Sequence, residues 1–161
     1  MHLGAIGDAT FVEIDAAAAA LAAQNAVENG WEARIEVLCD NVANVAKSRA
    51  GDAALVVCNP PYYVPGSGRT PIAAGRRAAR FGEVELFVDA AARLLGKGGR
   101  ACFVYPARDL ERIFTAFRDA SLEPKRLQLV HGRKDAPARV ALIEAMVGKR
   151  GGLIVMPPIY A

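Results

Sequence analysis

Short apolar runs alternate with longer helix-forming segments along most of the chain. Strands are expected at residues 9–14, 34–38, 53–58 and 100–105, with two more near 126–130 and 139–147. Helices are expected at residues 16–29, 42–48, 84–95 and 108–120. The run AALVVC at 53–58 has no polar position, which is typical of a central parallel strand buried on both faces. The alternation predicts an open α/β sheet with helices on both faces.

Length and hydrophobic content limit the class of protein. The chain has 161 residues, of which 53% are hydrophobic and 23% charged, so we expect a single domain over residues 1–161. The sequence contains no run of roughly 18 uncharged apolar residues, and its N-terminus lacks the basic start and apolar block of a signal peptide. We therefore expect a cytoplasmic protein without a membrane partner.

The cysteines do not form a metal-binding pattern. Cys39, Cys58 and Cys102 each lie in an apolar run, without C-x-x-C spacing and without a nearby pair of histidines. Buried, reduced thiols are expected instead of disulfides, and no metal site is expected.

The distribution of positive charge is more informative than the net charge of +3. Between residues 66 and 80 the chain carries four arginines and no acid: Arg69, Arg76, Arg77 and Arg80. Contacts to nucleic-acid phosphates would explain this run. A solvated loop followed by a helix start explains it equally well.

Polar side chains follow three of the expected strands. Glu13 ends the first strand, Asp40 follows the second and Asn59 follows the third. Open α/β sheets bind ligands at the carboxyl ends of their strands, and an acid there commonly accepts both hydroxyls of a ribose. Asp15 is favoured as the N-cap of the alanine-rich helix. Asp40 can cap the next short helix or bind a ligand, and both interpretations stay open.

The stretch Asn59-Pro60-Pro61-Tyr62 directly follows the most apolar strand. The prolines have no N–H, so the backbone cannot continue the sheet ladder and its carbonyls are left free. The Asn59 amide oxygen and the Pro60 carbonyl can accept the two hydrogens of a planar amino group, while the ring of Tyr62 stacks on its plane. Held in this way, the nitrogen lone pair points at an electrophile, and positioning supplies the catalysis.

This four-residue stretch resembles the motif of class I S-adenosylmethionine-dependent methyltransferases that modify amino groups of adenine, cytosine or glutamine. The following YYVPGSGRTPIAAGRRAARFGEVELFVDAAARLLGKGGRACFVYP and the later RLQLVHGRKDAPARVALIEAMVGKRGGL are similar to bacterial tRNA adenine-N6 methyltransferases that modify the adenine beside the anticodon of a valine tRNA. The resemblance covers nearly all of the chain from Phe11 onward. It implies a Rossmann-like methyltransferase sheet, an enzyme that uses S-adenosyl-L-methionine, and tRNA as partner.

The resemblance also implies a role for each candidate residue. Glu13 would bind the ribose of the cofactor and Asp40 its adenine, and Asn59 would also border the cofactor. Asn59 and Pro60 would hold the target amino group. Tyr62 would stack on a target base that is flipped or already unpaired. The substrate-entry loop would include Gly66, Gly68 and Arg69, and RNA phosphates would contact Arg76, Arg77 and Arg80.

The sequence departs from the family pattern in two places. The family's histidine before the glutamate is missing, and Phe81-Gly82 stands there instead. The family's first strand and glycine-rich turn, about 20 residues ahead of the acidic residue, have no counterpart, because Gly7 lies only six positions before Glu13. The chain is therefore expected to be N-terminally truncated and to lack this central strand. Exposed sheet edges would then promote self-association.

Three functions remain open from the sequence. The leading one is N6-methylation of an adenine in tRNA or another RNA. The same motif also serves methyltransferases that act on a protein glutamine or a DNA adenine. A third alternative is a catalytically inactive nucleic-acid-binding fragment, because the glycine-rich turn is missing.

Overall fold

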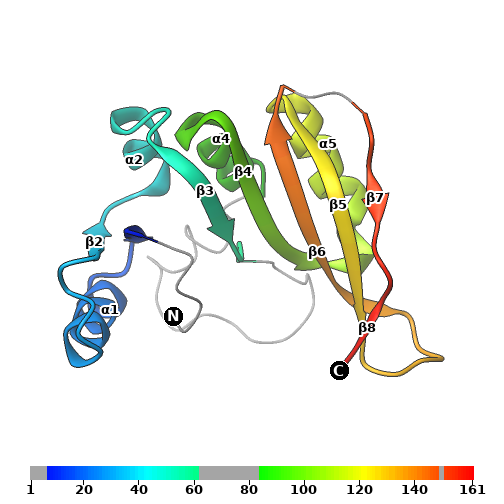
Figure 1. The fold of residues 1–161 in the computed structure, drawn as a ribbon, viewed down its shortest axis with the longest axis horizontal. Coiled ribbons are helices and arrows are strands. Elements are labelled where there is room, and N and C mark those ends of the chain that lie inside the picture. The colour runs from blue at the N-terminus through cyan, green and yellow to red at the C-terminus, as the bar shows by residue number, and fades with distance from the viewer. Residues whose placement is uncertain (1–6, 62–83, 149–150) are drawn as a thin grey trace. The chain divides into compact units, whose positions relative to one another are not determined.

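The computed structural model describes residues 7–61, 84–148 and 151–161. The chain divides into two compact units, Met1–Ser48 and Arg49–Ala161. Each unit contains its own sheet, drawn in Figure 1. The α/β fold class predicted from the sequence is confirmed, since each of the first four described strands is followed by a helix.

The N-terminal unit is one β-α-β motif followed by a helix. Its elements are β1 (Ala9–Glu13), α1 (Ala16–Glu28), β2 (Ile35–Cys39) and α2 (Val42–Ser48). The strands β1 and β2 pair in parallel, with Glu13 opposite Cys39. The predicted cap of α1 is confirmed, because Asp15 Oδ1 accepts hydrogen bonds from the backbone N–H groups of Ala17 and Ala18, each at 3.0 Å.

In its described residues, the C-terminal unit consists of a six-stranded mixed sheet and its helices. Its first elements are β3 (Ala53–Cys58), α4 (Val84–Leu94), β4 (Leu95–Pro106), a 3₁₀ turn (Ala107–Asp109) and α5 (Leu110–Asp119). The rest are β5 (Leu122–His131), β6 (Ala138–Val147), β7 (Ile154–Val155) and β8 (Ile159–Tyr160). The sheet order is β3-β4-β6-β5-β7, and β8 also pairs with β5. The strands β3 and β4 are parallel, whereas β6 runs antiparallel to both of its neighbours.

The helices α4 and α5 cover one face of this sheet (Figure 1). Alternate side chains of β4 and β6, for example those of Phe103 and Ile143, form the hydrophobic core together with side chains of α4 and α5. The rings of Phe103 and Phe117 meet edge to face with their centroids 5.3 Å apart. Both side chains are almost fully buried, so this contact lies at the centre of the core.

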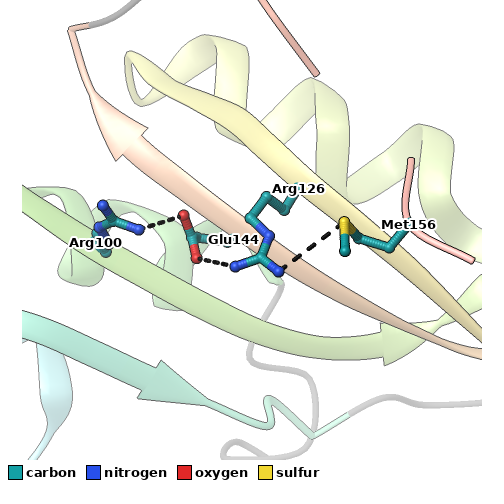
Figure 2. A network of polar contacts seen from close by, with 4 residues as sticks. All are labelled: Arg100, Arg126, Glu144 and Met156. Atoms are coloured by element: carbon teal, nitrogen blue, oxygen red, sulfur yellow. Dashed lines mark hydrogen bonds and ion pairs between the residues drawn. The ribbon is translucent and has the colours of Figure 1, made fainter. Parts of the chain in front are cut away.

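The opposite face carries a charged network, shown in Figure 2. Arg100 Nη1 lies 2.9 Å from Glu144 Oε1, and Arg126 Nη1 lies 3.8 Å from Glu144 Oε2. Arg126 also donates through Nη2 to the sulfur of Met156 at 4.0 Å. Backbone pairing adds to this attachment, since Met156 N–H donates to the Leu127 carbonyl at 2.8 Å. The C-terminal segment is thereby fastened to β5.

The environment of β3 differs from the prediction of a central strand buried on both faces. Among the described strands β3 ends its sheet and pairs only with β4, so Leu55 and Val57 are exposed.

The other differences lie mainly at the ends of the elements. The strand β4 begins at Leu95, earlier than predicted, because Leu95 already pairs with Ala53 of β3 ahead of a shift in register. Gly96 packs closely against a neighbouring turn. A side chain at Gly96 would place its Cβ 2.7 Å from the backbone oxygen of Gly51. The short strands β7 and β8 were not predicted. No helix within the described ranges is long and apolar enough to cross a membrane.

Candidate functional site

The carboxyl end of the N-terminal sheet brings Glu13 and Asp40 together. The two residues end adjacent parallel strands, and the backbone N–H of Asp40 donates to the Glu13 carbonyl at 3.1 Å. Glu13 is half-buried and Asp40 is exposed. Two carboxylates at one strand end form an acceptor site for hydroxyl or amino groups.

Each carboxylate uses one oxygen for local structure. Glu13 Oε1 accepts the N–H of Asp15 at 2.9 Å, which fixes the turn between β1 and α1. Asp40 Oδ1 accepts the N–H of Asn41 at 2.6 Å and the side-chain amide of Asn44 at 2.9 Å. Among the residues that the structure describes, no hydrogen bond reaches Glu13 Oε2 or Asp40 Oδ2. These two oxygens remain available to a ligand.

The N-cap of α2 is Asn41, not Asp40. Asn41 Oδ1 accepts the N–H of Ala43 at 2.9 Å, and the Asn41 backbone carbonyl accepts from Asn44 at 2.9 Å. The presence of an acid at position 40 is therefore not explained by capping of α2. The ligand role of Asp40 stays a prediction.

The carboxyl end of β3 carries Asn59 and Pro60. Asn59 follows Cys58, which lies opposite Phe103 of the parallel strand β4. Its side chain is exposed, and its amide has no hydrogen-bond partner in the described part of the chain. Pro60 is almost fully buried. The buried proline holds the backbone in place immediately after the asparagine. The exposed Asn59 amide remains available for a ligand.

Cys58 lies directly before this amide. Burial raises the pKa of the Cys58 thiol to about 12, so it is protonated at neutral pH. Burial, helped by the nearby Glu144 carboxylate, also raises the pKa of Cys102. Neither thiol is suited to act as a nucleophile. Chemistry at this strand end therefore depends on hydrogen bonding and positioning.

The other predicted site residues lie outside the described part of the chain. They are Tyr62, Gly66, Gly68, Arg69, Arg76, Arg77 and Arg80. Within the described ranges, no group of three or more His, Cys, Asp or Glu side chains is placed to hold a metal ion. A shallow hollow lined by residues 8–10 and 32–36 lies at the amino ends of β1 and β2, away from Glu13 and Asp40.

Curated relatives share substantial sequence with the chain. A tRNA1(Val) (adenine(37)-N6)-methyltransferase from Serratia proteamaculans is 34% identical over 137 residues, which is 82% of this chain and 51% of the relative. The enzyme of the same name from Pectobacterium carotovorum is 30% identical over 138 residues, 82% of this chain and 54% of the relative. The Enterobacter enzyme is 37% identical over 97 residues, 59% of this chain and 39% of the relative. The chain thus spans about half or less of the length of these relatives. No family model matches the sequence.

Solved structures give the fold. A predicted O-methyltransferase from Agrobacterium tumefaciens matches with a TM-score of 0.69 at 22% identity, over 94% of this chain and 67% of that chain. The chain has a methyltransferase fold. A class I S-adenosylmethionine-dependent methyltransferase from Listeria monocytogenes matches with a TM-score of 0.59 at 16% identity, over 92% of this chain and 49% of that one. The cyclase SpnF also matches, with a TM-score of 0.60 at 15% identity, over 89% of this chain and 67% of that chain. The methyltransferase fold alone therefore does not determine the reaction.

Proposed function

We propose that the chain takes part in S-adenosylmethionine-dependent N6-methylation of an adenine in tRNA. The observation that carries this proposal is the exposed Asn59 amide at the end of β3, followed by the buried Pro60, within a methyltransferase fold. The names of the curated relatives supply the substrate class. A tRNA substrate would place the activity in the cytoplasm.

The N-terminal carboxylates fit the cofactor's hydrogen-bond donors. S-adenosylmethionine carries a ribose diol and an adenine amino group, and its sulfonium supplies an electrophilic methyl group. Glu13 and Asp40 each retain a carboxylate oxygen that no described residue uses. A carboxylate accepts hydroxyl and amino donors strongly, because its negative charge assists the bond. In the proposed site Glu13 holds the ribose and Asp40 the adenine.

Asn59 and Pro60 orient the acceptor nitrogen. The Asn59 side-chain oxygen and the Pro60 backbone carbonyl accept the two N–H hydrogens of the adenine amino group. This arrangement would turn the nitrogen lone pair toward the sulfonium methyl group. As the N–C bond formed, the S–C bond would break and leave neutral S-adenosylhomocysteine, and the amino proton would pass to water. The proposal extends to Tyr62, which would stack on the target base. Gly66, Gly68 and Arg69 would form the entry loop, and Arg76, Arg77 and Arg80 would contact phosphates.

Methyl transfer to defined acceptors tests this function. The chain is incubated with methyl-tritiated S-adenosylmethionine and unmodified valine tRNA, and digestion of the RNA then identifies the labelled nucleoside. We expect N6-methyladenosine. Asn59→Ala should lower the rate by roughly 10²–10³-fold, the decrease found when one transition-state hydrogen-bonding group is removed. Asn25→Ala, which changes an exposed asparagine of α1, should leave the rate unchanged.

Other acceptors decide between the remaining alternatives. A glutamine-containing peptide and an adenine-containing DNA oligonucleotide are offered in parallel with the tRNA. Label in either acceptor but not in tRNA would contradict an RNA substrate. An absence of label in every acceptor, with RNA binding retained, would instead indicate an inactive nucleic-acid-binding chain.

We also infer that the chain self-associates through the free edge of β3. Among the strands that the structure describes, β3 is terminal in its sheet, and Leu55 and Val57 are 45% and 69% exposed. An apolar edge strand presents unpaired backbone groups to a second copy. Sedimentation should show oligomers that Val57→Lys disperses. Val155→Lys on the two-residue strand β7 is the matched control, and a wild-type monomer would contradict the inference.

A further inference from the structure

The loop between β5 and β6 lies beside the C-terminal strand β8. Residues Ile159 and Tyr160 of β8 pair in parallel with Val130 and His131 of β5. Beyond this pair, the N–H of Ala161 donates to the His131 carbonyl at 2.9 Å. Figure 1 shows this loop and the C-terminus at the same end of the sheet. Both are therefore parts of one surface within the C-terminal unit.

His131 holds the loop in place. Its Nδ1 lies 2.7 Å from the Ala136 carbonyl oxygen, and because a carbonyl only accepts, Nδ1 carries the proton and donates it. The N–H of Ala136 donates to the Arg133 carbonyl at 3.2 Å and closes a turn. The His131 and Tyr160 rings have their centroids 5.8 Å apart and are tilted by 48°. Tyr160 is 53% exposed, so this contact leaves a large part of the side chain open to solvent.

Three cations lie in or beside the loop that follows His131. Arg133, Lys134 and Arg139 are exposed, and Asp135 is the only acid between residues 132 and 139. The Arg139 side chain lies over Gly132, since a Cβ built there would be 3.3 Å from Arg139 Cδ and 3.6 Å from Nη1. Within the described residues, none of the three cations has an ion pair. Their charges are available to a partner.

This loop lies at the same end of the sheet as Asn59. β3 ends opposite Phe103 of β4, whereas β5 and β6 continue past that level to the pair of Val130 with Val140. The strands β4 and β6 lie between β3 and β5, so about three strand spacings, roughly 14 Å, separate β3 from β5 across the sheet. The loop also begins about four residues, roughly 13 Å, beyond the level at which β3 ends. A short stretch of RNA can bridge these distances. One nucleic-acid strand can therefore reach both places.

Free cations beside an exposed ring match the chemistry of unpaired RNA. Arginine and lysine neutralise phosphates, and an aromatic side chain stacks on a base whatever its sequence. An acidic peptide would use the cations but would gain little from the flat face of Tyr160. The combination therefore favours RNA.

We propose that the β5–β6 loop and Tyr160 form an RNA-binding surface. Arg133, Lys134 and Arg139 contact the phosphate backbone, and Tyr160 stacks on an unpaired base. The proposal rests on the proposed function for the class of substrate. It assigns to the loop a binding role separate from the transfer of the methyl group.

Fluorescence anisotropy with a labelled RNA stem-loop that carries unpaired adenines tests the surface. The affinity of the protein for this RNA is measured at several salt concentrations. The variant with Arg133→Gln, Lys134→Gln and Arg139→Gln should reduce the slope of log K against log salt by about two to three, roughly one for each phosphate that the variant no longer neutralises. Tyr160→Ala should weaken binding roughly tenfold, and Tyr160→Phe should retain it. Arg93→Gln with Lys97→Gln, exposed cations at the other end of the sheet, is the matched control.

The two proposals fail separately. Unchanged affinity and salt slope in the triple variant, or full affinity in Tyr160→Ala, would overturn the RNA surface even if methyl transfer occurs. Weaker RNA binding in both variants, with the control unaffected, would support the surface even if no methyl transfer is found. Circular dichroism of each variant must match the wild type, because β8 pairs with β5.

Discussion

The two units differ sharply in how much apolar surface they bury. Of the twenty buried hydrophobic residues in the described chain, the N-terminal unit contributes only four: Ala19, Ala26, Val45 and Ala46. The C-terminal unit buries large side chains, including Phe103, Phe117 and Ile113. In α1 of the N-terminal unit, Leu21 and Val27 are 57% and 62% exposed. The N-terminal unit, with its two-stranded sheet, is expected to be the less stable of the two.

The comparison separates two requirements of a binding site. Both units place polar groups at the carboxyl ends of parallel strands, Glu13 and Asp40 in one and Asn59 in the other. The positions of these polar groups therefore follow from the parallel pairing of the strands, whether or not a large core supports the strands. Holding the polar groups rigidly requires a core, which the C-terminal unit has and the N-terminal unit largely lacks.

Cysteine labelling gives the largest expected difference between the units. Cys39 of the N-terminal unit is exposed, so the prediction of a buried thiol was wrong there, whereas burial raises the pKa of Cys58 to about 12. At pH 8 only about one Cys58 thiol in 10⁴ is ionised, and the thiolate is the reactive form. Iodoacetamide followed by mass spectrometry should label Cys39 in the native protein and Cys58 only in denaturing urea. Equal labelling rates in the native protein would contradict the burial of the Cys58 thiol.

A core substitution tests whether the units unfold separately. Phe103→Ala should lower the free energy of unfolding of the C-terminal unit by about 3–5 kcal/mol, because it removes an almost fully buried ring. Urea unfolding followed by far-ultraviolet circular dichroism measures this decrease. Trp31 is the only tryptophan and lies in the N-terminal unit, so its fluorescence follows that unit.

We expect the fluorescence transition to stay in place in this variant. A Trp31 transition that moves together with the circular dichroism would show that the two units unfold as one. Leu21→Ala, at a site that is 57% exposed, is the control and should change stability by less than about 0.5 kcal/mol.

The ion pair between Glu85 of α4 and Arg112 of α5 is expected to have the smallest effect on stability. Arg112 donates through Nε and Nη2 to the two carboxylate oxygens of Glu85, each at 3.1 Å. These hydrogen bonds lower the pKa of Glu85 below its ordinary value of 4.5, so the stabilisation is complete above that value. It is lost as the pH falls through the lower pKa of the folded state. Because both side chains are largely exposed, Glu85→Gln should cost no more than about 1 kcal/mol.

The pH dependence of unfolding between pH 7 and 3 checks this pair. The wild type should lose stability relative to Glu85→Gln only at the acid end of this range. The same pH dependence in both proteins would rule out a role for the ion pair.

Local patterns in the sequence predicted most elements correctly. The position of β3 and the Asp15 cap of α1 were both predicted correctly, since each depends on neighbouring residues. The burial of β3 on both faces was predicted wrongly, because it depends on neighbouring strands, and β3 pairs only with β4 in the described part of the chain. The strands β7 and β8 could not be predicted from local pattern, because each has two residues and is defined by its pairing with β5. Asn41 was missed as the cap of α2 since Asp40, beside it, is an equally good capping residue type.

Positions in three dimensions were harder to predict. The proximity of Glu13 to Asp40 followed from the rule for parallel strand ends, and the structure brings them together. The contact of His131 with Tyr160 joins residues far apart in the sequence through a strand pairing that no motif announces. The roles of Glu13, Asp40 and Asn59 stay predictions.

Calorimetric titration with S-adenosylhomocysteine tests the division of labour between the two strand ends most directly. The wild type should bind, and Glu13→Ala should weaken binding roughly ten- to a hundredfold because it removes a charged hydrogen-bond acceptor. Asn59→Ala and the exposed control Glu28→Ala should bind like the wild type. Unchanged binding in Glu13→Ala, or no binding by the wild type, would contradict a cofactor site at the end of β1.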